Sequence, residues 1–366
     1  MRKQEYDIAA YVWPSYSGDD PRTLTFWPEG IGEWQSVRDA KPKFPGHVEP
    51  RKPLWGYVNE ADPNVMEMQI DAAVNHGVNV FIYDWYWYDN RPFLENCLND
   101  GFLGAPNNEK MKFYVMWANH NATNLWDKRN SHNENGTIIW EGTANRVQFE
   151  TVCHRIIDKY FSQPNYYKID GKPVFMFFDL PNLIKGLGGI EETKKALCWF
   201  KETCIKEGYL GLHLQSNIWY TSTMIFLDGR KIKHIDLVEM LGFASITNYQ
   251  FSNMSPLPNT YSKVLENAKN VWEELSKLKT TYIPHVSVGW DNNTRFYSYD
   301  DRIISKNTPD EIERAFRTAK EFLDNNPRTP KLITVNSWNE WTEGSYLQPD
   351  ELYGYGYLEA IKKVFR

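Results

Sequence analysis

Short apolar runs recur along this chain, and each ends in polar or aromatic residues. Most of the runs are continuous rather than alternating, which is typical of parallel strands buried on both faces. Eight of them are short enough to be strands, at residues 6–12, 78–83, 112–117, 173–178, 211–215, 237–243, 282–288 and 332–335. The pattern therefore predicts a parallel sheet that is covered on both sides.

Apolar residues at helical spacing separate these runs. Asp62-Pro63 begins one such segment, and others cover residues 147–160, 196–204, 265–275 and 357–365. The clearest helix start is Thr308-Pro309-Asp310-Glu311, a capping box with proline at the first helical position. Strands that alternate with helices predict an α/β fold, and we expect residues 1–366 to form a single (β/α)8 TIM barrel.

Three long irregular stretches follow the first, third and sixth predicted strands, at residues 14–55, 119–143 and 245–261. In a barrel the segments that follow the strands all lie at the C-terminal face, which carries the active site in essentially every enzyme of this fold. We therefore expect these long loops to build the active-site face.

Aromatic residues are unusually frequent, with 15 Trp, 22 Tyr and 19 Phe among the 366 residues. Their apolar faces and polar edges suit stacking on sugar rings, although an aromatic-rich core explains the same composition. The net charge of −6 and the lack of a basic run argue against a nucleic-acid partner. The composition therefore favours a hydroxyl-rich partner, an oligosaccharide or polysaccharide.

Other features of the chain bear on its compartment. The cysteines Cys97, Cys153, Cys198 and Cys204 show no CxxC spacing and are expected to be buried free thiols. No apolar run approaches the roughly 20 residues of a membrane span, and the first five residues lead straight into a strand. We expect a cytoplasmic protein, or a periplasmic or secreted one if a signal peptide has been removed.

The last predicted strand opens into Asn336-Ser337-Trp338-Asn339-Glu340-Trp341-Thr342-Glu343-Gly344. A turn of helix would place the Cβ atoms of Glu340 and Glu343 roughly 5 to 6 Å apart. Their carboxyls could then stand about 5 to 5.5 Å apart, the separation of a glycosidase that retains anomeric configuration. We predict that this pair is catalytic; the alternative is a helix-terminal carboxylate beside a surface charge.

Residues at the ends of the other predicted strands are mostly aromatic, amide or acidic, and a barrel would bring them to one cavity. Trp side chains would stack on sugar rings, while amide, acidic and His side chains would bind hydroxyls. Asp84 and His120 have structural roles as their alternative, and a turn role competes for His47, which lies on the first long loop. The predicted substrate-binding residues are Trp13, His47, Asp84, Trp85, Tyr86, Trp117, Asn119, His120, Tyr249, Trp290, Asp291 and Asn339.

No cofactor or metal is expected. The HxH and HExxH spacings of metal sites are absent, and so are the GxGxxG and GxxxxGK[ST] patterns of dinucleotide and nucleotide binding.

Several segments together resemble a known family. They are Gly32-Glu33-Trp34, Gly46-His47-Val48-Glu49-Pro50, Phe81-Ile82-Tyr83-Asp84-Trp85-Tyr86, Gly289-Trp290-Asp291-Asn292, Tyr353-Gly354-Tyr355 and the segment from Asn336 to Gly344. They are similar to the WbsX-like family, which is often labelled glycosyltransferase but is related to glycoside hydrolase family 99, the endo-acting α-mannosidases and α-mannanases. The resemblance extends from about Tyr6 to Phe365.

The resemblance implies a (β/α)8 barrel and a retaining, metal-independent glycosidase. By position, Glu340 would be the base that activates the sugar's own 2-hydroxyl to form a 1,2-anhydro intermediate, and Glu343 would be the general acid/base. A direct attack by Glu340 on the anomeric carbon is the alternative. The chain departs from the family pattern at Trp13-Pro14 and at Phe178-Asp179, so the sugar, mannose or rhamnose or another, stays open.

Two other functions remain as alternatives. One is a glycosyltransferase of polysaccharide biosynthesis, as the family label suggests, although the usual nucleotide-sugar motifs are not evident. The other is a glycan-binding protein without catalysis, which would keep the aromatic residues but tolerate the loss of either glutamate.

Overall fold

The protein is described by a computed structural model that covers residues 5–130, 136–219, 223–227 and 229–366. Within these ranges nine parallel strands pair in the order β14-β12-β9-β8-β4-β2-β1-β17-β15. Their bounds are β1 Asp7–Val12, β2 Val80–Tyr88, β4 Lys112–Trp117, β8 Lys172–Phe177, β9 His213–Asn217, β12 Ser245–Thr247, β14 Thr281–Tyr282, β15 His285–Ser287 and β17 Leu332–Asn336.

The two outermost strands of this order are two pieces of one strand. β14 pairs with β12, and β15 pairs with β17, yet only Ile283 and Pro284 separate them. Proline has no N–H to donate to a neighbouring strand, which accounts for the interruption. The sheet therefore closes on itself as a barrel of eight strands, the (β/α)8 fold expected from the sequence.

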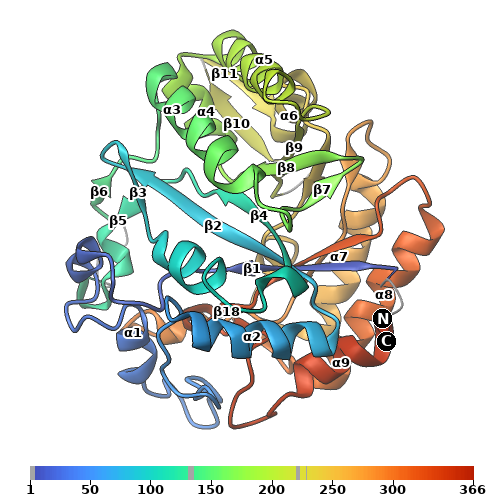
Figure 1. The fold of residues 1–366 in the computed structure, drawn as a ribbon. Coiled ribbons are helices and arrows are strands. Elements are labelled where there is room, and N and C mark those ends of the chain that lie inside the picture. The colour runs from blue at the N-terminus through green and yellow to red at the C-terminus, as the bar shows by residue number, and fades with distance from the viewer. Residues whose placement is uncertain (1–4, 131–135, 220–222, 228) are drawn as a thin grey trace.

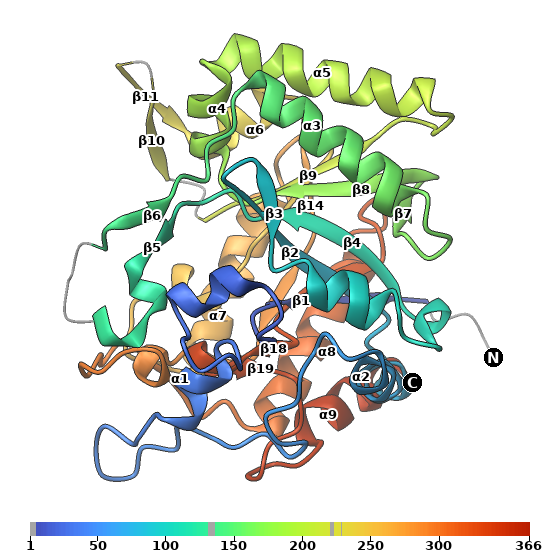
Figure 2. The same ribbon diagram turned by 60° about the vertical axis from the view of Figure 1, so that its left-hand side comes forward.

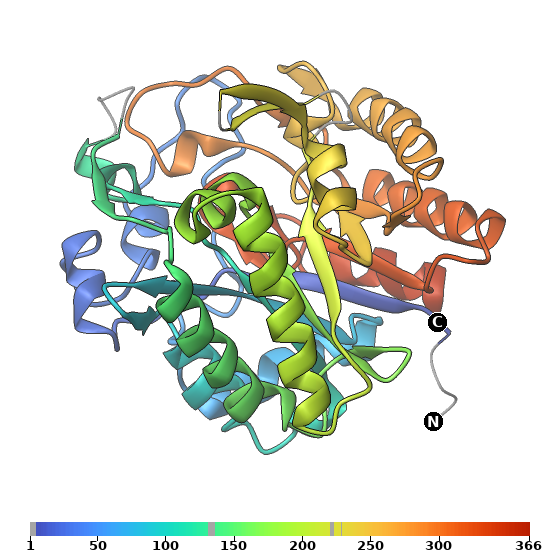
Figure 3. The same cartoon turned by 90° about the horizontal axis from the view of Figure 1, so that it is seen from above.

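Helices surround this barrel (Figures 1 and 3). They are α2 Pro63–His76, α3 Arg146–Ile156, α4 Leu180–Leu187, α5 Ile190–Lys206, α6 His234–Met240, α7 Tyr261–Leu275, α8 Pro309–Asn325 and α9 Gly356–Phe365. A π-helix, Cys97–Phe102, takes the helix position between β2 and β4. The rings of Tyr6 and Phe365 lie 5.4 Å apart, so the start of β1 meets the end of α9.

The helix signals read from the sequence are confirmed. The Asp62 side chain accepts a hydrogen bond from the Asn64 N–H with Pro63 in the first turn, and α2 ends at Gly77 with a φ of 100°. At the start of α8 the Thr308 hydroxyl accepts from the Glu311 N–H, again followed by proline. These caps satisfy N–H groups that lack partners inside the helix.

The prediction for the sixth strand was wrong. Residues 237–243 lie mostly in helix α6, and the strand is the shorter β12, Ser245–Thr247. The buried residues Ile235, Val238 and Leu241 follow helical spacing, which a short apolar run conceals. β12 is mostly polar because it faces a polar barrel interior, where the hydroxyls of Thr247 and Thr334 lie 2.6 Å apart.

The second strand is longer than predicted. β2 continues to Tyr88 and pairs with β3, Arg91–Phe93, so the segment around Asp84 lies within a strand rather than after one. Successive side chains of a strand point to opposite sides. This extension therefore separates Asp84 and Tyr86 from Trp85.

Short elements cover the carboxyl ends of the strands. β1 and β2 run from right to left in Figure 1, and their carboxyl ends point toward α1, β5 and β6. Figure 2 shows the hairpins β5-β6 and β10-β11 on one side of the barrel. These elements are α1 Trp34–Arg38, β5 Ala122–Thr123, β6 Ile138–Trp140, β10 Met224–Leu227, β11 Arg230–Lys233, β13 Asn259–Thr260, β16 Ile304–Ser305, β18 Asn339–Glu340 and β19 Ser345–Tyr346, while β7 Lys168–Ile169 pairs with β8.

Two sequence expectations concern the chain as a whole. All four cysteines are free, but only Cys97, Cys153 and Cys204 are buried; Cys198 is exposed on α5, contrary to expectation. In the described part of the chain, no helix has both the length and the apolar character needed to cross a membrane. Residues 1–4 and 131–135, which entered the predictions for the N-terminus and the second long loop, lie outside the described residues.

Candidate active site

The two predicted catalytic glutamates lie on a tight hairpin that follows β17. Glu340 ends β18, and Glu343 ends a single 3-10 turn, Trp341–Glu343, where a turn of α-helix was expected. Gly344 reverses the chain with a φ of 59°, a conformation that favours glycine. Both glutamates are buried, with 4% and 8% of their surfaces exposed.

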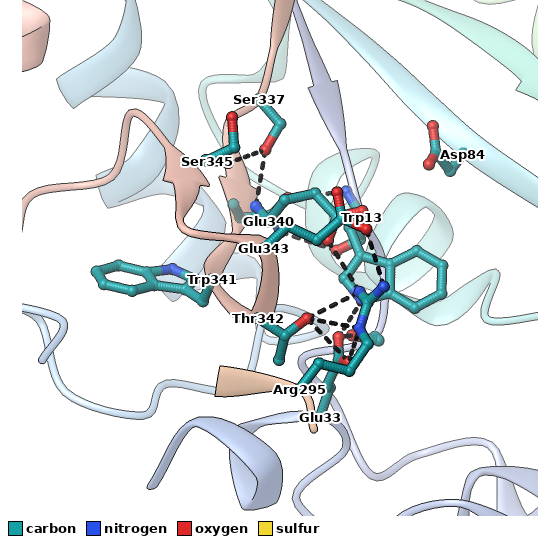
Figure 4. Close-up of polar contacts among 12 residues, drawn as sticks. Trp13, Glu33, Asp84, Arg295, Ser337, Glu340, Trp341, Thr342, Glu343 and Ser345 are labelled. Atoms are coloured by element: carbon teal, nitrogen blue, oxygen red, sulfur yellow. Dashed lines mark hydrogen bonds and ion pairs between the residues drawn. The ribbon is translucent and has the colours of Figure 1, made fainter. Parts of the chain in front are cut away.

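Serine side chains fix this hairpin (Figure 4). The Glu340 N–H donates to the Ser337 hydroxyl at 2.7 Å, and that hydroxyl donates to the Ser345 carbonyl at 2.7 Å. Ser345 in turn donates to the Asn336 carbonyl at 2.8 Å. The backbone that carries both carboxyls is therefore held by neighbouring side chains rather than by a long helix.

Arg295 joins the two carboxyls. Its Nη1 lies 2.8 Å from Glu343 Oε1, and its Nη2 lies 3.3 Å from Glu340 Oε2. The same guanidinium donates to the Thr342 hydroxyl at 2.8 Å and lies 3.4 Å from Glu33 Oε1. Figure 4 shows Arg295 between Glu33 and the hairpin. One buried cation therefore faces three carboxyls.

Glu33 is a third carboxyl of the site, carried by the first long loop. Besides Arg295, it accepts hydrogen bonds from the Trp13 indole N–H, from the Ser15 hydroxyl at 3.2 Å and from the Thr342 hydroxyl at 3.1 Å. Hydrogen bonds to the charged form favour an ionised carboxylate. Glu33 thus anchors Arg295 and the indole of Trp13 in the site.

Asp84 is a fourth carboxyl, on the side away from Arg295 in Figure 4. The Tyr249 hydroxyl lies 3.0 Å from Asp84 Oδ2 and 3.3 Å from Glu340 Oε1. The other Asp84 oxygen, Oδ1, and Glu343 Oε2 are buried and have no hydrogen-bond partner among the described residues. Buried polar atoms rarely stay unpaired, so these two oxygens are acceptors available to a ligand.

Burial shifts the protonation of these carboxyls. It raises the pKa of Glu340 well above its ordinary value, as does the nearby Glu343, while Arg295 lowers it. Burial also raises the pKa of Glu343, again against Arg295. For Asp84, burial raises the pKa well above the ordinary value and the hydrogen bond from Tyr249 opposes this shift. Carboxyls with raised pKa values are suited to give and take protons near neutral pH.

These groups meet in a cavity of about 230 Å³. Its walls are aromatic and its floor is acidic, a combination that suits a sugar ring. The lining residues are Trp13, Asp84, Tyr86, Ala118, His120, Trp126, Phe178, Tyr249, Arg295, Glu340 and Glu343. The cavity therefore unites both predicted catalytic residues with five of the predicted substrate-binding residues: Trp13, Asp84, Tyr86, His120 and Tyr249.

His120 offers this cavity an acceptor rather than the expected donor. Its Nδ1 lies 3.0 Å from the Asn121 carbonyl, and burial lowers its pKa. The neutral ring must therefore carry its hydrogen on Nδ1, since a carbonyl can only accept, which leaves Nε2 as an acceptor. The rings of Tyr86, Trp126 and Phe178 hold the imidazole in place.

Trp85 and Trp117 do not line the cavity, contrary to the expected convergence. Alternation along the strands turns both rings toward the surrounding helices. The Trp85 indole N–H donates to Glu95 at 2.7 Å, and Trp117 packs between Phe149 and Phe177. The structure gives both rings packing roles.

Asn119 and Asn339 also lie outside the cavity lining. Asn119 exchanges two hydrogen bonds with the Asp179 backbone, at 2.7 and 2.9 Å. Asn339 does the same with the Trp13 backbone, both at 2.8 Å, and donates to Glu60 at 2.7 Å. Both amides therefore tie neighbouring strand ends together, and Asn339 positions Trp13 rather than a sugar hydroxyl.

His47, Trp290 and Asp291 line a second cavity of about 190 Å³ beyond Gly344. His47 Nε2 lies 2.8 Å from Asp291 Oδ2, which links the first long loop to the exit of the seventh strand. The structure thus brings these three residues together away from the two glutamates. A contact with substrate stays a prediction for them.

The site-lining residues that the sequence did not single out are Arg295, Trp126 and Phe178, together with Glu33 behind them. Arg295 lies in a loop, and its partners are 45 to 48 residues away on the hairpin. The only sequence hint for Glu33 is its place in Gly32-Glu33-Trp34. Over the described ranges, no group of three or more His, Cys, Asp or Glu side chains is placed to hold a metal ion.

Solved structures with a similar fold are glycoside hydrolases. The GH99 endo-alpha-mannosidase from Bacteroides thetaiotaomicron matches at a TM-score of 0.63 and 14% identity, over 99% of this chain and 97% of that one. A structure described as a glycoside hydrolase-like protein matches at 0.63 and 16%, over 100% and 95%. A beta-glucosidase from Thermotoga maritima matches at 0.51 and 13%, over 98% and 97%. At these identities the likeness shows the fold alone.

Sequence relatives give the family. The "Uncharacterized protein WxcX" of two strains of Xanthomonas campestris pv. campestris is 26% identical over 98% of this chain. This chain spans about half of that protein's length, 49%. Residues 8–361 match the family model described as Glycosyltransferase WbsX. Because that match covers nearly the whole chain, the chain belongs to the Glycosyltransferase WbsX family.

Proposed function

We propose that the protein is a glycoside hydrolase that cleaves an α-linked glycan with retention of configuration. One observation carries the proposal: two buried carboxyls on one rigid hairpin share Arg295, and Glu343 keeps an unpaired oxygen beside the cavity. A glycosidase needs one carboxyl that donates a proton and one that takes up charge. The GH99 endo-alpha-mannosidase fold and the family resemblance support this assignment.

In this proposal Glu343 is the general acid/base. Burial raises its pKa, so it holds a proton that it can give to the leaving oxygen; it then takes a proton from the attacking water. Glu340 acts as a base toward the sugar's 2-hydroxyl, as the family resemblance implies. An internal nucleophile has a high effective molarity once the ring is held in place. The rings of Trp13, Tyr86 and Trp126 wall the cavity that holds this sugar.

The test is a screen of purified protein against α-mannans, rhamnose-containing glycans and other bacterial and plant glycans, followed by chromatography of the released sugars. Glu343→Gln and Glu340→Gln should each abolish release, since each removes an ionisable group without changing shape. Glu359→Gln on α9 serves as the control, because Glu359 contacts His76 and Lys362 on the outer surface. Loss of activity in only one of the two site variants would contradict the paired mechanism.

The anomer formed first decides the stereochemistry. Proton NMR at early times should show the α-anomer, and a β-anomer would refute retention. A substrate that lacks the 2-hydroxyl should be inert if Glu340 acts on that hydroxyl, whereas cleavage would favour direct attack by Glu340 on the anomeric carbon.

The family description supports a glycosyltransferase as the second candidate function. The same buried carboxyls could take the proton from an acceptor hydroxyl. Consumption of a nucleotide sugar in the presence of an acceptor glycan, with no hydrolysis across the panel, would establish this function and refute the hydrolase.

A further inference from the structure

Asp84, Tyr249 and Glu340 form a continuous chain across the cavity. The Tyr249 hydroxyl is within 3.0 Å of Asp84 and 3.3 Å of Glu340, and both carboxyls are 4% exposed. The Tyr249 ring is held by Tyr11 at 4.8 Å and by Phe178 at 5.1 Å between ring centroids. The hydroxyl is thus fixed between two carboxyl groups that come from different strands.

The hydrogens of this chain do not suffice if both carboxyls are ionised. A phenol has one hydrogen and can donate it to only one oxygen. The second contact becomes a hydrogen bond only when a carboxyl carries a proton and donates it to the phenol oxygen. The geometry therefore calls for one proton shared between Asp84 and Glu340.

The surroundings decide where that proton is needed. Glu340 faces Glu343, Glu33 and Arg295 on one side and Asp84 and Tyr249 on the other, with the Tyr16 and Tyr86 hydroxyls nearby. Asp84 faces Tyr249, Glu343, Tyr86 and Tyr11. Arg295 pairs with Glu340, whereas Asp84 has no ion pair in the described part of the chain. A proton is thus better placed on Asp84, away from the cation.

We propose that Asp84 holds this proton and thereby keeps Glu340 ionised, with Tyr249 as the carrier between them. When the proton is on Glu340, Glu340 donates to the phenol oxygen and the phenol donates to Asp84. To move it, Glu340 gives its hydrogen to the phenol oxygen while the phenol gives its own to Asp84. Two O–H bonds break and two form, so the net change is one proton transferred to Asp84.

This assignment rests on the proposed function for its role, because it supplies the ionised Glu340 that the base must be. Neutral Asp84 still presents Oδ1, which has no partner among the described residues, as an acceptor for a sugar hydroxyl. Asp84 and Tyr249 are therefore positioning residues for Glu340, and Asp84 also takes part in binding.

The test follows the carboxyls directly and needs no substrate. Protein labelled with ¹³C at the Asp and Glu side-chain carboxyls is titrated by NMR, and the signals are assigned with Asp84→Asn and Glu340→Gln. Asp84→Asn should lower the pH at which Glu340 titrates by about 1 unit or more, since it removes a like charge. Tyr249→Phe should raise it, because the carboxylate loses a donor. A merely structural contribution predicts no such opposite pair of shifts.

Asp179→Asn is the matched control. Asp179 is a partly buried N-cap of α4, and asparagine caps a helix equally well. Its replacement should leave the titration of Glu340 unchanged. An unchanged Glu340 titration in Asp84→Asn, with the fold intact by circular dichroism, would overturn the proposal even if glycan is hydrolysed. Coupled titration without hydrolysis of any glycan would uphold the shared proton and refute the proposed function instead.

Discussion

Replacing Arg295 by methionine removes the cation that faces Glu33, Glu340 and Glu343 while keeping a side chain of similar length. The guanidinium is 2.8 Å from Glu343 and 3.3 Å from Glu340, and its side chain is only 14% exposed, so solvent screens these contacts weakly. The three carboxylates hold the pKa of Arg295 above its ordinary value despite burial, so the wild-type side chain is charged at every working pH.

The size of the effect follows from this contact. An opposite charge at such a distance changes a carboxyl pKa by about 1 to 3 units. Without Arg295, the pKa values of Glu340 and Glu343 should both rise by about that amount. The acidic limb of the pH-rate profile reports ionisation of the base Glu340, and the alkaline limb reports deprotonation of the acid Glu343. Both limbs should therefore move to higher pH.

The assay is the pH dependence of kcat/KM with the best glycan from the panel, for wild type, Arg295→Met and Arg295→Lys. At the wild-type optimum, Arg295→Met should lose about 10- to 1,000-fold in kcat/KM, because each pH unit changes the ionised fraction of Glu340 about tenfold. Arg295→Lys keeps the charge and should shift the limbs less. A lower profile that stays at the wild-type pH would refute the electrostatic reasoning.

Three further outcomes are expected from stability and activity measurements on single variants. Trp85→Phe should cost about 1 kcal/mol of unfolding free energy in urea, from the lost hydrogen bond to Glu95, and leave kcat/KM unchanged, whereas a large loss of activity would restore a binding role for Trp85. Burial raises the pKa of Glu60 to about 7, so its contribution to stability is present below about pH 4.5 and is lost as the pH rises through 7. Relative to Glu60→Gln, wild-type stability should therefore fall over that range by up to about 3 kcal/mol, and parallel curves would contradict this. Gly344→Ala should cost about 1 to 2 kcal/mol, because its φ is 59° and the added Cβ would lie 3.1 Å from Asp291, and thermal unfolding at wild-type temperature would show that the turn relaxes freely.

The sequence by itself determined the order of the elements and the position of the two glutamates. Continuous apolar runs at 112–117 and 332–335 report burial on both faces, and Thr308-Pro309 reports a helix start; both are local properties of the chain. Because alternating strands and helices have few ways to close, these local patterns sufficed for the barrel. The hairpin with Glu340 and Glu343 followed from its place after the last strand.

Only the tertiary structure decided which side chains meet. Trp85 and Asp84 are neighbours in the sequence, yet one packs outward and the other enters the cavity, because β2 continues past both. Arg295 reaches Glu33 across 262 positions of the chain, a contact that no local pattern encodes. Burial and caps are set by neighbours a few residues away, whereas protonation in this site depends on charges brought together from five different strand ends. The physical reason is that the Coulomb interaction depends on distance in space, and the fold alone fixes that distance.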